Sequence, residues 1–469
     1  MELQTYDPKA LLQAIATKDV KAIRHAFEEF NLVDIAETLN EAILEEETTL
    51  ITDLIFVFKT VPPSYTAEVF SYLDDDLKEK LIALLTSEQI SSILENLFSD
   101  DIVDFLEEMP SNLMKKILQS ATKETRSEIN HLLDYKANSA GSIMTTEFVE
   151  LKARDTVKGA MEKIRKQGKE AETISYLFVV DAQRILVGTL RLRDLIFAEE
   201  GATVGDIMET DFVSIYTHDD QEEVAKKFKR YDLNALPVTT QDDRLVGIIT
   251  ADDIIDVIDQ EATEDIQIMA AVAPLGDEYM KTSVLSLAKK RVVWLFVLMF
   301  SATFTGLIIG SYENLMQHLP VLAMFIPMLM DTGGNAGGQT STLVIRGLAL
   351  GEIEITDYWQ VLRKEIGVAL IAGGALGLFD FVWILVQNEL GLISVGSNAT
   401  PPYLIAGMVA ITLFVTVFLA KSVGSTLPIL AKRLKLDPAL MAGPLMTTIV
   451  DALSLMLYFF IATQIFHLV

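Results

Sequence analysis

Residues 442–466, AGPLMTTIVDALSLMLYFFIATQIF, form a long apolar run that contains a single charged residue, Asp451. A helix needs roughly 20 mostly apolar residues to cross the hydrocarbon core of a bilayer. This run meets that requirement, and so do four stretches before it: 292–310, 319–345, 366–386 and 403–430. The sequence therefore predicts a C-terminal domain, residues 289–469, that crosses a membrane five times.

Charge divides the chain into two parts. Residues 286–469 carry ten basic and ten acidic side chains, so the formal net charge of −28 resides entirely before residue 286. An acidic domain repels nucleic acid and anionic membrane surfaces and attracts cations, although acidity can also serve solubility alone. The chain has no cysteine and only five histidines, so any bound metal is expected to have oxygen ligands, as Mg²⁺, Ca²⁺ and Mn²⁺ prefer.

Loop charges predict the orientation of the spans. Two of the expected loops, 311–318 and 387–402, contain no Lys or Arg. The segments on the other side are basic: Lys289, Lys290, Arg291, Arg346, Arg363, Lys364, Lys432, Arg433 and Lys435. The positive-inside rule then puts the N-terminal part in the cytoplasm and the C-terminus outside a cell membrane. The first residues lack a basic stretch followed by an apolar run, so no cleaved signal peptide is expected.

The chain before the membrane domain shows three patterns. Residues 1–136 place apolar side chains three and four positions apart, which predicts short helices in an all-α superhelix. Residues 137–260 repeat a strand, helix, strand, turn, strand, helix pattern twice. Residues 261–288 predict a connecting helix, a break at Pro274-Leu275-Gly276 and a second amphipathic helix. The expected fold is thus multidomain: a helical N domain, an α/β pair, a connecting helix and a five-helix transmembrane domain.

Helix-breaking residues lie inside two of the spans. Pro327 and the run 333–335 are expected to interrupt the second span, and Gly424 and Pro428 to interrupt the fourth. Broken helices at membrane depth persist only where their backbone faces protein or a water-filled cavity. These interruptions therefore favour a path through the membrane domain.

Ionisable side chains inside a span are costly and count as functional hypotheses by default. Three carboxylates qualify: Asp331, Asp380 and Asp451. Helical spacing puts Thr447 and Thr448 on the face of Asp451, which makes an oxygen-rich stripe suited to a cation. The alternative is a structural ion pair between Asp451 and Lys421 of the fourth span. We take this stripe and Asp331 as candidate pore residues.

One aspartate per chain cannot surround a cation. A two-fold axis along the path would bring two copies of the stripe together. Mg²⁺ gives up its waters reluctantly, so such a path could recognise the hydrated ion through carboxylate, hydroxyl and carbonyl oxygens.

The duplicated pattern over residues 137–260 resembles a tandem pair of CBS domains, a fold that commonly dimerises and senses nucleotides or ions. The second copy carries the family's nucleotide-type pattern as Gly247, Thr250 and Asp253. This resemblance implies that ATP or another adenine nucleotide binds at Thr250 and Asp253. The first copy has Arg191 where the hydroxyl residue would stand, and so departs from the pattern.

Two membrane motifs, PMLMDTGGNAGGQTSTLVIRGLALGEI (327–353) and DPALMAGPLMTTIVDALSLMLYF (437–459), resemble signatures of the MgtE family of Mg²⁺ channels. The similarity covers essentially the whole chain and implies a homodimer with one pore on its two-fold axis. It assigns Asp451 to the selectivity site, Asn335 with Gly334 to the pore lining, and Asp437 to the cytoplasmic mouth. Some members carry Asn where this chain has Gly443, so contacts at that level can differ.

The same resemblance implies gating by cytoplasmic Mg²⁺. Carboxylates at domain boundaries repel one another without metal and are clamped together with it, so ion occupancy biases a two-state element. The residues that match the family's regulatory positions are Asp100, Asp104, Asp253, Asp256, Glu261, Glu264 and Asp265.

The sequence therefore predicts a Mg²⁺-selective channel or transporter that mediates magnesium uptake and is gated by Mg²⁺ at its N and CBS domains. Two alternatives remain open at this point: a transporter for another divalent cation such as Mn²⁺ or Co²⁺, and a non-conducting membrane sensor that contains CBS domains. The sequence has no Walker motif, nucleophile triad or zinc signature, so an enzyme is not expected. The expected partners are a second copy of the chain, the transported ion and membrane lipid, but no nucleic acid.

Overall fold

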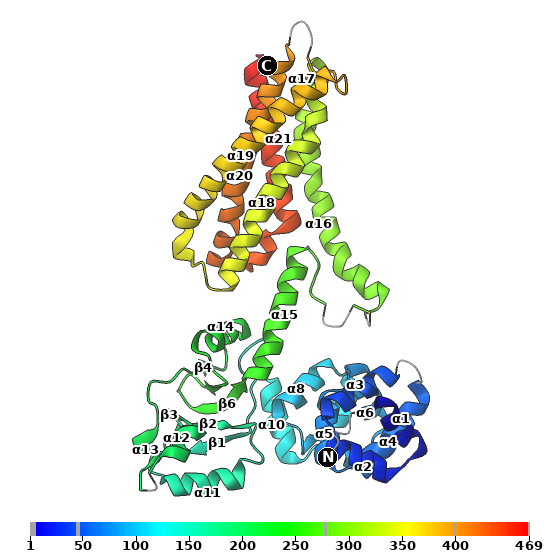
Figure 1. Cartoon of the computed structure of the whole chain (residues 1–469), viewed down its shortest axis with the longest axis vertical. Coiled ribbons are helices and arrows are strands. Elements are labelled where there is room, and N and C mark those ends of the chain that lie inside the picture. The colour runs from blue at the N-terminus through cyan, green and yellow to red at the C-terminus, as the bar shows by residue number, and fades with distance from the viewer. Residues whose placement is uncertain are drawn as a thin grey trace. The chain divides into compact units, whose positions relative to one another are not determined.

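The computed structural model of this chain describes residues 6–43, 47–199, 201–275, 279–280, 282–396 and 400–467 (Figure 1). The chain divides into two compact units, Met1–Ile258 and Asp259–Val469, each of which is described by itself.

The first unit opens with short amphipathic helices, as the apolar spacing predicted (Figure 1). Aspartates fix several helix starts: the Asp19 carboxylate accepts hydrogen bonds from the backbone N–H groups of Lys21 and Ala22. The apolar faces meet in one continuous core that includes Phe70 and Leu81. The helices are α1 Pro8–Thr17, α2 Val20–Glu29, α3 Leu32–Ile43, α4 Glu47–Thr60, α5 Pro63–Ser71, α6 Asp75–Leu84, α7 Ser87–Leu94, α8 Ser99–Glu108, α9 Ser111–Ser120 and α10 Lys123–Leu133.

The rest of the first unit contains the predicted duplication. Each copy has a three-stranded sheet in which the first strand pairs parallel to the second, and the second pairs antiparallel to the third. The first copy comprises β1 Phe148–Leu151, α11 Val157–Gln167, β2 Thr173–Val180, β3 Leu186–Arg191, α12 Leu192–Phe197 and α13 Val204–Ile207. The second comprises β4 Ile215–Tyr216, α14 Gln221–Tyr231, β5 Ala235–Thr239, β6 Leu245–Thr250 and α15 Ala251–Met269. The two sheets share an apolar cluster that includes Phe178 and Ile248.

The helical part and the second α/β copy are packed together within this unit. Val103 of α8 and Leu132 of α10 join the core that contains Phe228 of α14. Beside this core, the Glu147 carboxylate accepts hydrogen bonds from the hydroxyls of Ser99, at 2.8 Å, and Thr145, at 2.7 Å. These contacts bring the start of α8 to the edge of the sheets.

The connecting region differs from the expectation. The last helix of the second copy, α15, continues without a break to Met269, so no separate connecting helix begins at residue 261. Pro274 and Leu275 follow in a non-helical stretch, and Gly276 lies outside the described residues. The expected second amphipathic helix is the first part of α16, Val284–Ser311, which is one helix with the first apolar span.

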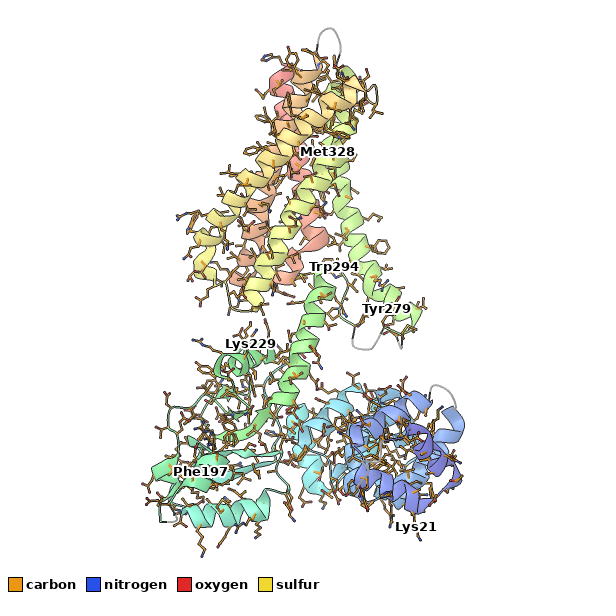
Figure 2. The ribbon with its side chains drawn as sticks, viewed as in Figure 1. Lys21, Phe197, Lys229, Tyr279, Trp294 and Met328 are labelled. Carbon is orange, nitrogen blue, oxygen red and sulfur yellow. The ribbon has the colours of Figure 1, made fainter. Side chains whose placement is uncertain are left out.

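The second unit is a bundle of long helices (Figure 1). No described residue of α16 is buried, and its apolar side chains, Trp294 among them, project all around it (Figure 2). The elements after α16 are α17 Glu313–His318, η1 Pro320–Phe325, α18 Ile326–Ala349, η2 Ile355–Asp357, α19 Tyr358–Glu389, α20 Pro402–Arg433, η3 Pro438–Met441 and α21 Gly443–Phe466.

Four stretches of the described chain are long and apolar enough to span a membrane: Val284–Ser311, Ile355–Glu389, Pro402–Arg433 and Pro438–Phe466. The remaining predicted span, α18, falls short of that hydropathy although it packs along α20 and α21. Its sequence explains this, because it carries Asp331, Asn335, several glycines and three threonines. The most polar of the five predicted spans is thus the one with the most candidate functional residues.

The interruptions predicted at 333–335, Gly424 and Pro428 are wrong, whereas the second predicted span does change near Pro327, where the 3-10 helix η1 ends and α18 begins. Helix α18 starts at Ile326 with Pro327 in its first turn, where proline is tolerated, and continues through the glycine run. Helix α20 continues past Pro428 to Arg433. A Cβ added at Gly424 would lie 2.5 Å from the Gly337 carbonyl oxygen, so this glycine permits a close helix crossing.

We predict that Gly424→Ala destabilises the membrane unit, because its methyl group would overpack the contact between α18 and α20 at a cost of about 1–3 kcal/mol. The measurement is the thermal midpoint of the purified protein in detergent. Gly374→Ala is the matched control, since a Cβ there meets no atom within 4 Å. Equal midpoints for the two variants would contradict the packing role of Gly424.

Candidate cation path and acidic cluster

A cavity of about 430 Å³ lies between the first half of α18 and the first half of α21. It brings together five of the six predicted pore residues, whereas Thr448 is not in its lining. The lining residues are Ile326, Pro327, Met330, Asp331, Gly334, Asn335, Thr447 and Asp451.

Gly334 allows the two helices to approach at this cavity. A Cβ added at Gly334 would lie 3.1 Å from Cγ2 of Thr447 and 3.7 Å from Oδ1 of Asp451. Any larger side chain would therefore push against Thr447 and enter the space beside the Asp451 carboxylate. The glycine leaves that carboxylate next to the backbone of α18.

The threonine hydroxyls of α21 use their protons within the helix. Thr447 and Thr448 both donate to the carbonyl oxygen of Pro444, at 2.9 and 2.8 Å. A hydroxyl whose proton is used in this way offers only lone pairs to other partners. Thr447 thus presents an acceptor to the cavity, and water molecules around a cation would donate to such an acceptor.

The two cavity carboxylates have no basic partner in the described part of the chain. Within the part of the membrane unit that the structure describes, neither Asp331 nor Asp451 forms an ion pair. The alternative pairing of Asp451 with Lys421 is wrong, because Lys421 lies 3.7 Å from Glu365 instead. The cavity therefore combines two acidic groups with amide and hydroxyl oxygens and contains no basic side chain.

The other two membrane-unit carboxylates from the sequence lie elsewhere. Asp380 is 3% exposed and faces α20 from α19, outside the cavity lining. Asp437 begins η3, where its carboxylate accepts a hydrogen bond from the Ala439 backbone N–H at 2.8 Å. Asp437 thus holds the turn that joins α20 to α21.

The first unit gathers a second group of carboxylates, here called the acidic cluster: Asp100, Asp101, Asp104, Glu172 and Asp253. The first three lie on α8, Glu172 precedes β2, and Asp253 lies in the first turn of α15. Asp100, Asp104 and Asp253 were predicted from the sequence as regulatory residues, whereas Asp101 and Glu172 were not. No sequence pattern around Glu172 indicates that it joins the cluster, because its position there depends on the parallel pairing of β1 with β2.

Burial is the main reason that the carboxyl groups of this cluster have high pKa values. Burial first, and the charge of Asp253 second, raise the pKa of Asp101 to about 6, of Asp104 to about 7 and of Glu172 to about 8. The pKa of Asp100 is well above its ordinary value for the same two reasons. Among the described residues, however, no three Asp, Glu or His side chains are arranged so as to hold a metal ion. The carboxylates of the cluster therefore repel one another but do not form a coordination shell for a metal ion.

The other expected regulatory residues follow Asp253 along α15. Asp256 is exposed in the first unit. Glu261, Glu264 and Asp265 belong to the second unit, and their spacing of three and four residues puts them on one side of the helix.

The predicted nucleotide pair forms a local cap. The Thr250 hydroxyl and backbone N–H both donate to Oδ2 of Asp253, at 2.7 and 3.3 Å, at the start of α15. In the first copy, Arg191 Nε donates to Asp194 Oδ2 at 2.7 Å in the corresponding place. Asp253 therefore belongs to both this cap and the acidic cluster.

Comparison with known proteins decides the family. The MgtE family, described as divalent cation transporters, matches residues 326–461; the MgtE intracellular N domain matches 30–138, and CBS domains match 140–201 and 204–260. The "Magnesium transporter MgtE" of Thermus thermophilus is 34% identical, over 97% of this chain and 97% of its own length. This chain belongs to the MgtE family.

Other comparisons agree with this assignment. The Bacillus subtilis "Magnesium transporter MgtE" is 35% identical over 88% of this chain and 92% of its own length. A solved structure described as the soluble part of a magnesium transporter is 33% identical, with a TM-score of 0.51, and covers 54% of this chain and 98% of that one. Members of the MgtE family are transporters, not enzymes, and with its apolar helices this chain is a multi-pass membrane protein.

The raised pKa values predict how the stability of the first unit depends on pH. A carboxyl whose pKa is higher in the folded than in the unfolded state binds its proton more tightly when folded. Its stabilising effect is complete below about pH 4 and is lost as the pH rises through about 6 to 8. In the presence of EDTA, the thermal midpoint of this unit should therefore fall between about pH 5 and about pH 8.

Glu172→Gln should flatten that pH profile, because it removes the carboxyl whose pKa is shifted to about 8. Glu170→Gln, at an exposed position two residues earlier, is the control and should leave the profile unchanged. A midpoint that stays constant or rises over this pH range would refute the arrangement of the cluster.

Proposed function

We propose that this chain is a Mg²⁺-selective channel or transporter that mediates magnesium uptake. The observation that carries the proposal is the cavity between α18 and α21. There Asp331 and Asp451 have no basic partner among the described residues and lie beside Asn335 and the acceptor oxygen of Thr447. Relatives that are named magnesium transporters over nearly the whole chain support the choice of ion.

The cavity suits a hydrated ion. Mg²⁺ keeps about six waters at near-octahedral geometry, and six waters occupy on the order of 200 Å³ at about 30 Å³ each. A cavity of about 430 Å³ has room for that complex. Carboxylate, amide and hydroxyl oxygens would then accept hydrogen bonds from the bound waters, so the ion need not shed them.

A second copy of the chain would complete the site. One chain supplies two carboxylates at the open side of the cavity, and a two-fold axis would bring the same set from the partner. Exposed apolar side chains support homodimerisation: α16 is unburied, and in the CBS pair Phe197 is 82% exposed. Membrane lipid would cover the remaining apolar surface, with the N-terminus in the cytoplasm and the C-terminus outside.

We further propose that cytoplasmic Mg²⁺ gates the path. The acidic cluster stores repulsion that a divalent cation would relieve. Asp253 of this cluster lies at one end of α15, and at the other end Ile268 and Met269 pack against Ile345 of α18 and Ala439 and Ala442 next to α21. A change at the cluster therefore has one helix through which it can act on the cavity helices.

Nucleotide binding at the second CBS copy is also part of the proposal. The match to CBS domains and the Thr250–Asp253 cap support a site for ATP or another adenine nucleotide. Because Asp253 is shared with the acidic cluster, nucleotide and Mg²⁺ would influence each other's binding there.

We predict that Asp451→Asn lowers Mg²⁺ flux into liposomes containing the purified protein by about tenfold or more, since each tenfold corresponds to about 1.4 kcal/mol of lost ion stabilisation. Asp380→Asn is the matched control, because that carboxyl also lies in the membrane unit but outside the cavity. Absence of Mg²⁺ flux in the unmodified protein would overturn the transport proposal in favour of a sensor. Flux of Mn²⁺ or Co²⁺ that exceeds Mg²⁺ flux would overturn its selectivity.

We predict that protease cleavage between residues 270 and 290 decreases as Mg²⁺ rises from zero to millimolar, because a clamped cluster holds α15 in one state. Asp253→Asn should weaken this protection, whereas Asp259→Asn, at an exposed position on the same helix, should not. Cleavage that does not respond to Mg²⁺ in the unmodified protein would count against gating.

A further inference from the structure

A polar triad joins three helices of the membrane unit: Thr340 of α18, Glu365 of α19 and Lys421 of α20. The Lys421 ammonium lies 3.7 Å from Oε2 of Glu365 and donates to the Thr340 hydroxyl oxygen at 3.1 Å. That hydroxyl donates in turn to Oε2 of Glu365 at 2.7 Å. Lys421 is 6% exposed and Thr340 is 1% exposed, so the triad is inside the bundle.

Stability alone is a poor reason for such a triad. Removing two opposite charges from water costs several kcal/mol each, and well-packed apolar residues of similar size often do as well or better. Breaking one partner, in contrast, leaves a buried unpaired charge, which is strongly unfavourable. The energetic effect of the triad is therefore to penalise any arrangement of the three helices in which its members separate.

The triad lies on the side of α18 that is opposite to Asp331 and Asn335 of the cavity. At 100° per residue, Thr340 shares a face with Gly333 and Gly337, whereas Asp331 and Asn335 are on the other face. A Cβ added at Gly424 would lie 3.2 Å from the Thr340 Cβ, so α18 and α20 are in close contact beside the triad. Because both sets lie on α18, rotation of this helix about its axis would separate the triad and would at the same time displace Asp331 and Asn335 in the cavity.

We propose that the triad of Thr340, Glu365 and Lys421 is a positioning device that sets the rotation of α18 and thereby the shape of the cation path. The inference rests on the proposed transport function for its effect on ions. It also explains the neighbourhood of Asp451: Glu365 and Thr340 engage the one lysine that sequence spacing offered as a partner for that carboxylate.

The absence of cysteine permits a direct test of helix rotation. Gly338 lies one turn after Gly334 on α18, and a Cβ there meets no atom within 4 Å. Gly338→Cys is introduced into the full-length protein in liposomes. It is studied alone and in combination with each of three single changes: Glu365→Gln, Lys421→Met and Thr340→Val. A further variant combines it with the double change of Glu365→Gln and Lys421→Met. We measure the rate at which a water-soluble thiol reagent labels the cysteine. The ratio of Mn²⁺ flux to Mg²⁺ flux is measured on the same variants with Gly338 kept.

Each single change in the ion pair should alter the labelling rate and the flux ratio by about threefold or more, a coupling in the range typical of residues that act through a helix. The double change leaves no unpaired charge, so it should restore the thermal midpoint. It also removes the ion pair that sets the rotation of α18, so the labelling rate and the flux ratio should stay altered by about threefold or more. Thr340→Val should have a smaller effect in the same direction. Glu389→Gln, at an exposed position near the end of α19, is the control and should change neither.

Single variants that keep their thermal midpoint, labelling rate and flux ratio would overturn the proposal. So would a double variant that regains the labelling rate and the flux ratio of the unmodified protein, because only the unpaired charge would then matter. If a single variant does not fold, the double variant and Thr340→Val still decide the matter. Labelling requires no ion flux, so loss of the transport proposal would leave the rotational arm of the test intact.

Discussion

Close packing of α18 against α20 and α21 is the constraint on which the membrane unit depends. Gly337 and Gly424 let two backbones meet, and Gly334 brings a third contact beside Asp451. In a membrane, where apolar side chains gain nothing by leaving lipid, such close contacts and internal hydrogen bonds hold helices together. A helix as polar as α18 is stable in the bundle because its neighbours cover it. The same contacts turn its Asp331 and Asn335 towards a cavity.

The first unit works on the opposite principle. Its acidic cluster lies between the helical part and the CBS pair, where burial and mutual repulsion oppose ionisation. Ordinary apolar contacts, such as Val103 and Leu132 against Phe228, offset that repulsion. One part of the chain thus holds its carboxylates at the cavity between α18 and α21 by tight packing. The other holds carboxylates together against their charge, which makes their association sensitive to whatever neutralises them.

Local patterns in the sequence were enough to predict most of the secondary structure and part of the cavity lining. Apolar periodicity predicted the helices and the repeated α/β copies, and spacing along α21 predicted that Thr447 and Asp451 share a face. The roles of residues that depend on tertiary contacts could not be predicted from the sequence. Gly424 and Pro428 suggested a broken helix because their packing against α18 is not visible in the chain. Glu172 joins the acidic cluster only through strand pairing, and the partner of Lys421 comes from a different helix than expected.

Carboxyls that hold their protons near neutral pH have one further thermodynamic property. A divalent cation that binds them must displace those protons, so cation binding and proton release are linked. With the pKa of Asp104 at about 7 and of Glu172 at about 8, the acidic cluster would exchange protons for the cation at cellular pH. Its apparent affinity for a cation would then decline in an acidified cytoplasm. Such a cluster reports the concentration of the metal relative to that of the proton, rather than the metal alone.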